Sequence, residues 1–200
     1  MTVGGKSKKK AEFGDFQTPI ELARKVCSLL SQHGLEPVSI LEPTCGRGSF
    51  IVAALESFAC IRSIVGIDID SEHVRIACSS VQEIAPAAGS VRIMNNDFFA
   101  VDWDHVLESL PDPLLVIGNP PWVTNAELGR IGSNNLPDKS NFQNRRGIDA
   151  ITGNSNFDIS EWMLNKALEW INGREATLAM LCKTAVARKV LHNAWKRGEH

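Results

Sequence analysis

The chain has 200 residues, of which 44% are hydrophobic and 22% are charged. This composition is typical of a globular domain, and it excludes a disordered tail, a fibrous protein and a disulfide-stapled miniprotein. The net charge of −2 includes four lysines and no acid within residues 1–10, so the remainder is acidic overall. That balance is unlike the basic surface of a free-standing nucleic-acid binder.

The cysteines and histidines are scattered singly along the chain. None of the five cysteines belongs to a Cys-x-x-Cys pair, and the five histidines form no metal-ligand cluster. This pattern predicts neither a disulfide framework nor a protein-bound metal, and it favours a reducing, cytoplasmic setting. No apolar run approaches the roughly 20 residues that span a bilayer, and no secretory signal is recognisable.

The first elements in the chain are an arm and a helix. Residues 1–12 are expected to form a flexible basic arm. A helix is predicted from Thr18 to Gly34, with Thr18 as N-cap, Pro19 in the first helical position and Glu21 three residues after the cap. Its expected apolar stripe consists of Leu22, Val26, Leu29 and Leu30.

Short apolar runs then alternate with amphipathic stretches. The runs predict strands at Val38–Leu41, Ile64–Ile69, Val91–Met94, Leu114–Ile117 and Ala176–Leu181. The stretches predict helices at Ser49–Phe58, Ser71–Ile84, Ile159–Ile171 and Thr184–Arg197. This alternation indicates an α/β fold, a mostly parallel sheet with helices on both faces. Ligands of such sheets bind beyond the carboxyl ends of the strands, so the residues that follow each strand are the candidates for a site.

Two glycines and an acidic residue follow the first two predicted strands. Gly46 and Gly48 allow the backbone to approach a ligand closely, although a simple strand-to-helix turn would use the same residues. Asp68 comes 22 residues after Gly46, a spacing at which a carboxylate binds the ribose of a nucleoside cofactor. In the alternative interpretation Asp68 is only an exposed strand end, and Asp70 or Ser71 caps the next helix.

The third and fourth strands are followed by polar and aromatic residues. Asn96-Asp97-Phe98-Phe99 combines an acceptor and a ring, which an adenine needs, but a turn above a core phenylalanine would look alike. Asn119-Pro120-Pro121-Trp122 is the most informative motif in the chain. The prolines remove backbone donors, Asn119 adds a side-chain carbonyl and Trp122 adds a flat ring. Such a site accepts hydrogen bonds from a planar amine and stacks on its ring.

Together these segments resemble the gamma-class DNA amino-methyltransferases, S-adenosylmethionine-dependent enzymes of restriction–modification systems that mostly make N6-methyladenine. The resemblance starts near residue 13, and Phe16-Gln17-Thr18-Pro19 precedes the glycine loop as that class requires. It implies a Rossmann-like class I methyltransferase sheet. The catalytic domain would cover residues 13–200, with a long loop at 122–157 near the catalytic site.

The resemblance also implies a role for each motif residue. Thr18 and Pro19 would border the methionine end of S-adenosylmethionine, and Asp97 with the backbone of Phe98 would contact its adenine. Asp68 would bind the ribose and Ile69 would pack on the adenine. The amino acid moiety would be held by Glu42 and by the loop of Thr44, Cys45, Gly46 and Gly48. The target amine would be bound by Asn119, Pro120 and Pro121, with Trp122 stacked on the flipped base.

The family's pattern extends beyond this sequence. Two further strands and a target-recognition domain would follow residue 200, so the sheet is expected to be truncated. DNA would be the partner of the complete enzyme, with target recognition carried by a further region or by a partner chain. Cys182-Lys183-Thr184 departs from the proline-containing turn expected after the fifth strand, and the sequence suggests no function for it.

Three interpretations stay open at the level of sequence. The first is the catalytic part of a DNA adenine-N6 methyltransferase. RNA and protein-glutamine methyltransferases share the Asn-Pro-Pro-aromatic motif, so an enzyme acting on another planar amine or amide is the second. The third is a cofactor-binding subunit that is inactive without a partner chain. A dinucleotide-dependent oxidoreductase fits poorly because the third glycine of its fingerprint is absent.

Overall fold

The computed structural model describes residues 17–85, 89–122 and 158–198. These residues belong to two compact units. The larger unit comprises residues 17–120 and 166–181, and the smaller one includes residues 121–165 and 182–200. The expected basic arm at 1–12 and nearly all of the loop at 122–157 lie outside the described residues. The extent of the catalytic domain therefore stays a prediction.

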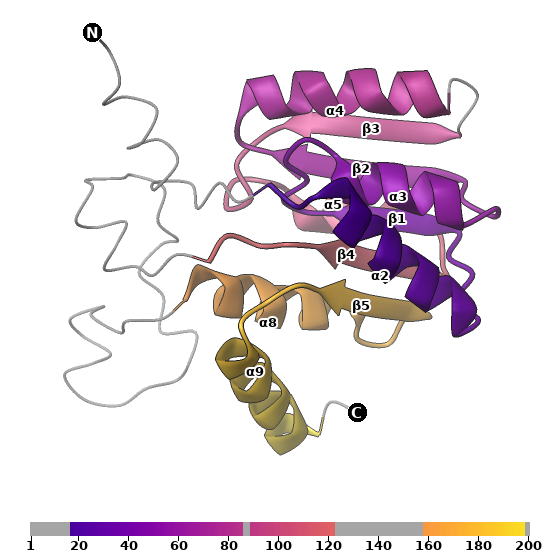
Figure 1. The fold of residues 1–200 in the computed structure, drawn as a ribbon. Helices are drawn as coiled ribbons and strands as arrows, with labels where there is room; N and C mark the ends of the chain where they lie inside the picture. Colours follow the sequence, from indigo (N-terminus) through magenta and orange to yellow (C-terminus); the bar gives the residue numbers. More distant parts are fainter. Residues whose placement is uncertain (1–16, 86–88, 123–157, 199–200) are drawn as a thin grey trace, which may run out of the picture. The chain divides into compact units, whose positions relative to one another are not determined.

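The larger unit is built on one five-stranded parallel sheet (Figure 1). Its strands follow the order β3-β2-β1-β4-β5, and every neighbouring pair is parallel. The strands are β1 (Ser39–Glu42), β2 (Ser63–Asp68), β3 (Ser90–Asn95), β4 (Leu114–Gly118) and β5 (Ala176–Met180). Each matches its predicted range closely. The central strands β1 and β4 are buried along their whole length, as continuous apolar strands of a covered sheet should be.

Helices α2 (Ile20–Gln32), α3 (Ser49–Ser57) and α4 (Ser71–Ile84) share a core with one face of the sheet. Phe50, Ile51 and Val81 pack there with Ile40 and Ile64 of the strands. Buried residues at the alternate strand positions, such as Leu41, Val65 and Val116, belong to the opposite face. Both faces of the sheet are therefore covered, which confirms the predicted fold class.

A short helix that the sequence did not reveal, α5 (Trp103–Glu108), lies between β3 and β4. Right-handed crossovers assign α5 and the second part of α8 (Ile159–Ile171), residues 166–171 of the larger unit, to the face opposite α3. Ring contacts join the two helices, because the centroid of Trp103 lies 4.4 Å from that of Trp170. Phe98 lies against the same pair, at 4.9 Å from Trp103 and 5.8 Å from Trp170.

The start of α2 differs from its prediction. Pro19, not Thr18, is the N-cap, and no side-chain hydrogen bond caps the helix. Thr18 is engaged elsewhere, because its carbonyl accepts from Ser49 Oγ at 2.8 Å and its hydroxyl accepts from Asn119 Nδ2 at 3.3 Å. The predicted capping arrangement was therefore wrong because tertiary contacts take up Thr18.

The predicted apolar stripe of α2 was also wrong in part. The buried residues are Ala23 and Cys27, with Val26 and Leu30 packed against the same core. Leu22 and Leu29 are exposed. The two small residues lie in the core shared with α3, where their size permits a close approach of the two helices. The prediction placed the leucines in the core because they are the more hydrophobic residues. The close approach of α2 to α3 leaves room only for small side chains at the buried positions.

The smaller unit contains the first part of α8 and the whole of α9 (Thr184–Arg197). Lys189 Nζ on α9 lies 2.6 Å from Glu161 Oε2 on α8, where the glutamate is buried. Both helices have the bounds that their sequence pattern predicts. Among the described residues, no helix combines the length and apolar character that a membrane span requires.

The small residues on α2 provide a test of this packing. Ala23→Leu forces a larger side chain into a filled core and should lower the free energy of unfolding by about 1–3 kcal/mol. The matched change Leu29→Gln, on the exposed side of the same helix, should stay within about 0.5 kcal/mol of the wild type. Urea unfolding followed by circular dichroism measures both, and equal losses would contradict the packing described here.

Candidate functional site

Most of the candidate residues named from the sequence lie at the carboxyl edge of the sheet. Parallel pairing brings the strand ends together, since Asp68 is paired with Asn95 in register and Gly118 with Met180. Glu42 ends β1 and pairs with Gly66. The loops after β1, β2, β3 and β4 therefore start from one edge of the sheet, as expected of a ligand site in this class of sheet.

The loop after β1 is shaped by two glycines with positive φ. Gly46 has φ 52° and Gly48 has φ 81°, and Gly48 is also the N-cap of α3. A Cβ on Gly48 would lie 3.0 Å from the Cβ of Ala77, so α4 leaves no room for a side chain. The loop is tied to β2, since Cys45 N donates to the carbonyl of Ile67 at 2.7 Å. Glycine is thus required here both for conformation and for space.

Asp68 supports the same loop from the end of β2. Its Oδ2 accepts from the backbone N–H of Gly46 at 2.8 Å, and its Oδ1 accepts from the N–H of Asp70 at 2.9 Å. The ring of His73 lies beside it, with Nδ1 at 3.3 Å from Oδ1. A carboxylate offers about four acceptor positions, so Asp68 keeps capacity for a further donor on Oδ2.

The segment that precedes α2 contacts the loop after β1, which we call the glycine loop. Gln17 Oε1 accepts from the N–H of Arg47 at 3.0 Å, and a Cβ on Gly46 would lie 2.6 Å from that oxygen. Ser49 Oγ donates to the carbonyl of Thr18. We call Gln17, Thr18 and Pro19 the strap. Its first two residues are thus bonded to Arg47 of the loop and to Ser49, the first residue of α3.

Two buried oxygen atoms at this edge have no hydrogen-bond partner in the described part of the chain. They are Glu42 Oε2, at the end of β1, and Asn119 Oδ1, directly after β4. The Nδ2 of the same Asn119 is paired, since it donates to Thr18 Oγ1. Buried polar atoms without partners are rare and costly, and both oxygens are acceptors to which a ligand could donate.

The environment of Glu42 is strongly desolvated. Burial raises the pKa of this carboxyl well above its usual range. A hydrogen bond from the backbone N–H of Ile51 lowers the pKa in part, and the negative charge of Asp68 raises it further. A cationic group bound beside Glu42 would favour the ionised carboxylate. Burial also raises the pKa of the neighbouring Cys45 thiol, which therefore stays protonated and leaves the backbone as the polar part of that residue.

The loop after β3 is organised by its own side chains. Asn95 Nδ2 donates to the carbonyls of Asp68 and Ile69 at 3.0 and 2.9 Å, which connects the ends of β2 and β3. Asp97 Oδ1 accepts from the N–H of Phe99 at 2.9 Å. The ring of Phe98 is buried in the aromatic cluster, and its carbonyl accepts from Trp103 Nε1 at 2.9 Å. Ile69 is 37% exposed and presents an apolar surface beside this loop.

The motif after β4 is divided between the two units. Asn119 and the buried Pro120 belong to the larger unit, whereas Pro121 and the partly exposed Trp122 belong to the smaller one. Within the smaller unit, Lys183 Nζ lies 2.7 Å from Asp158 Oδ2 and 3.4 Å from the carbonyl oxygen of Trp122. Lys183 is the residue after β5 for which the sequence suggested no function, and here it joins two other segments.

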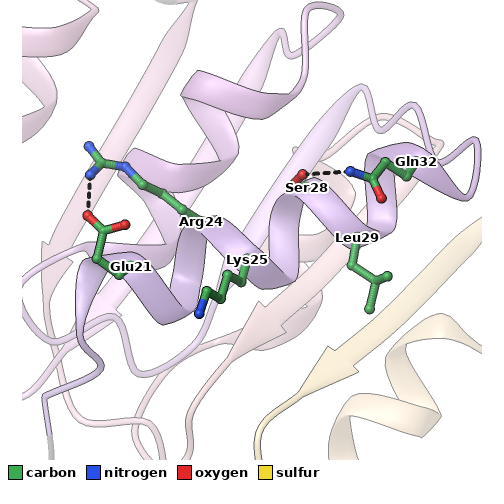
Figure 2. A pocket seen from close by; sticks show the side chains of 6 residues that line it. All are labelled: Glu21, Arg24, Lys25, Ser28, Leu29 and Gln32. Carbon is green, nitrogen blue, oxygen red and sulfur yellow. Dashed lines mark hydrogen bonds and ion pairs between the residues drawn. The ribbon is translucent and has the colours of Figure 1, made fainter.

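A shallow hollow lies along α2 (Figure 2). All of its lining residues come from the exposed side of one helix, namely Glu21, Arg24, Lys25, Ser28, Leu29 and Gln32. Several of them are engaged with one another, since Arg24 donates to Glu21 and Gln32 donates to Ser28. A surface of this kind offers no converging polar groups, so we do not consider it a functional site.

Sequence reasoning assigned no role to several residues that organise the site, namely Gln17, His73, Asn95 and Lys183. Gln17 is the variable position of a motif, Asn95 is the first residue after the third predicted strand, and Lys183 lies in the segment noted after the fifth. His73 carries no local signal. Within the described ranges no cluster of three or more histidine, cysteine or acidic side chains is arranged to hold a metal ion. All five cysteines are free thiols.

Comparison with known proteins identifies relatives over most of the chain. The model of the N-6 DNA Methylase family matches residues 5–181. Type II methyltransferase M.NspV of Nostoc sp. (strain ATCC 29411 / PCC 7524) is 50% identical over 92% of this chain. Type II methyltransferase M.CvrRI of Paramecium bursaria Chlorella virus XZ-6E is 32% identical over 58% of it. The chain spans only 38% of the first relative and 26% of the second.

Solved structures share the fold at low sequence identity. A structure described as a class I S-adenosylmethionine-dependent methyltransferase from Listeria monocytogenes matches with a TM-score of 0.61 and 18% identity, over 92% of this chain and 53% of the other. The modification subunit assigned to a type I restriction enzyme of Vibrio vulnificus YJ016 matches with a TM-score of 0.51 and 16% identity, over 96% of this chain and 39% of the other. The fold is thus that of the class I methyltransferases.

The raised pKa of Glu42 predicts how stability depends on pH. The contribution of such a group is fully present below the unfolded pKa, near 4.5, and is lost as pH rises through the higher folded pKa. Relative to Glu42→Gln, the wild type should therefore lose about 1.4 kcal/mol of unfolding free energy for each pH unit crossed in that window. Urea unfolding between pH 5 and 9 measures this, with the exposed Glu36→Gln as control, and parallel curves for wild type and Glu42→Gln would contradict it.

Proposed function

The chain belongs to the N-6 DNA Methylase family, and we propose that it carries the cofactor- and amine-binding groups of an enzyme that methylates adenine N6 in DNA with S-adenosylmethionine. The observation that carries this proposal is the buried, unpartnered Oδ1 of Asn119. An acceptor of that kind, followed by two prolines that cannot donate, suits a substrate that brings N–H groups.

The amino acid end of S-adenosylmethionine fits the loop after β1. Glu42 Oε2 is the second buried oxygen without a partner, and the cofactor's ammonium group would supply both a donor and a compensating positive charge. The backbone of Thr44, Cys45, Gly46 and Gly48 would contact the remainder of this moiety, where the glycines allow close approach. Thr18 and Pro19 are proposed to border the methionine end.

The nucleoside end fits the loops after β2 and β3. Asp68 Oδ2 keeps acceptor capacity for a ribose hydroxyl while its other bonds hold the carboxylate in place. The exposed surface of Ile69 would pack on the adenine, and Asp97 with the backbone of Phe98 would contact its polar edge. These roles are supported by position and chemistry together, because each residue follows a strand that ends at the same edge.

The chemistry at Asn119 follows from the poor nucleophilicity of an adenine amine, whose lone pair is delocalised into the ring. Asn119 Oδ1 and the carbonyl of Pro120 would accept both amine hydrogens and localise the lone pair on nitrogen. The cofactor supplies an electrophilic methyl group on its sulfonium. As the N–C bond forms, the methyl–sulfur bond would break and leave S-adenosylhomocysteine, and the cationic methylated amine would release its extra proton to water. Because that proton is acidic, no strong general base is needed, and alignment of the amine with the methyl carries most of the rate enhancement.

Access to the amine requires the adenine to leave the DNA duplex. Flipping costs a few kcal/mol, and stacking on the partly exposed Trp122 would offset part of this cost. The family description, which names DNA, and the Type II methyltransferase names of the relatives support a restriction–modification role with DNA as the partner. Target recognition by a further region or a partner chain belongs to the same proposal. A cytoplasmic setting is part of the same proposal.

Cofactor binding tests the first half of this proposal. Calorimetric titration of S-adenosylhomocysteine into the chain should show saturable one-to-one binding. Asp68→Ala should weaken it by at least about tenfold, the equivalent of 1.4 kcal/mol, because a charge-assisted hydrogen bond to the ribose is lost. Asp104→Ala, which removes an exposed carboxylate of α5, is the control. A folded chain that binds no S-adenosylhomocysteine would contradict the cofactor assignment.

Methyl transfer tests the second half. With tritiated S-adenosylmethionine and unmethylated DNA, Asn119→Ala should lower kcat by about 100-fold, the cost of losing one group that stabilises the transition state. Binding of S-adenosylhomocysteine should change less than about threefold, since Asn119 contacts the amine and not the cofactor. Asn172→Ala, in an exposed turn, is the matched control. Equal losses in both measurements, or label found in RNA or protein rather than DNA, would overturn the assignment.

A further inference from the structure

Asn119 donates to a residue that lies 101 positions earlier in the chain. Its Nδ2 is 3.3 Å from Thr18 Oγ1, and its Oδ1 is buried without a partner. We infer that Thr18 is a positioning residue that orients the Asn119 amide, so that the acceptor end of the amide faces the target amine. This inference rests on the proposed function and assigns Thr18 a role beyond bordering the cofactor.

The two ends of an asparagine amide are nearly equal in size and opposite in hydrogen bonding. One end accepts and the other donates twice, so packing alone distinguishes them poorly. A hydroxyl can pair with either end, and in this structure Thr18 Oγ1 accepts from Nδ2, which holds the amide with Oδ1 as the end without a partner. If Nδ2 faced the target amine, donors would oppose donors and neither amine hydrogen would be accepted there. The Thr18 hydroxyl engages Nδ2 and leaves Oδ1 as the group available to a substrate.

Thr18 is itself held by the glycine loop. Its carbonyl accepts from Ser49 Oγ at 2.8 Å, and the preceding Gln17 accepts from the N–H of Arg47 at 3.0 Å. On the other side, the carbonyl of Pro19 accepts the N–H groups of Leu22 and Ala23, the first turn of α2. The strap is thus held by hydrogen bonds on both sides of Thr18, which keep the Thr18 hydroxyl in a fixed position.

This arrangement connects two parts of the proposed site. The loop that would hold the amino acid end of the cofactor also holds the strap, and the strap holds Asn119. A displacement of the loop would therefore reach the amine-binding group through Ser49 and Thr18. Loss of the hydroxyl should affect the amide of Asn119 and methyl transfer more than it affects cofactor binding.

The amide of Asn119 can be observed directly by nuclear magnetic resonance of the ¹⁵N-labelled chain, without cofactor or DNA. Its side-chain signals are identified by their disappearance in Asn119→Ala. In Thr18→Val, which removes the hydroxyl and keeps the shape, the geminal proton that faces Thr18 should shift upfield, while Thr18→Ser should retain the wild-type shift. Thr184→Val, at the exposed start of α9, is the matched control and should leave the signals unchanged.

Kinetics supply the second readout. Thr18→Val should lower kcat for methyl transfer by about tenfold, with a smaller change in the Kd for S-adenosylhomocysteine, and Thr18→Ser should restore most of the activity. An Asn119 amide that is unchanged in Thr18→Val, or a Thr18→Ser protein as impaired as Thr18→Val, would overturn the inference. A shifted amide in a protein that methylates no DNA would retain the positioning role and reject the proposed function instead.

Discussion

The parallel pairing of β1 with β2 and β4 is the constraint on which the site depends. It places the end of every strand at one edge, where backbone groups and side chains can no longer pair within the sheet. Glu42 is the last residue of β1 and Asn119 directly follows the neighbouring β4, and each has a buried oxygen without a partner in the described part of the chain. Such burial lowers stability, and the ligand proposed for this edge would supply the missing donors.

The contacts around these two residues connect the segments that carry the site. In the loop after β1, the N–H of Gly46 donates to Asp68 and the next N–H donates to Gln17. Thr18, in the same strap as Gln17, accepts from Asn119. Each bond connects segments that are distant in sequence. Organisation of this kind reduces the ordering that a bound substrate must impose, which is how binding groups gain effectiveness in transfer reactions.

The contrast between α4 and α2 shows where prediction from sequence succeeds. The bounds of α4 were predicted correctly because its cap is local in sequence. Asp70 is the N-cap, and its side chain accepts from the backbone N–H of Glu72 in the first turn. The capping residue and buried stripe of α2 were mispredicted, because Thr18 is engaged by distant residues and the core beside α3 accepts small side chains. The six-residue α5 was missed because so short a segment shows too little periodicity.

The sequence by itself determined the alternation of strands and helices, the parallel sheet and the motif residues at the strand ends. These features depend on local patterns of apolar residues, glycines and prolines, and each is complete within a few neighbouring positions. Only the tertiary structure decided that Thr18 pairs with Asn119, that Gln17 covers Gly46 and that Lys183 joins Asp158. Those contacts depend on distances between segments up to 101 residues apart, and such distances are set by sheet order and packing, which no local pattern encodes.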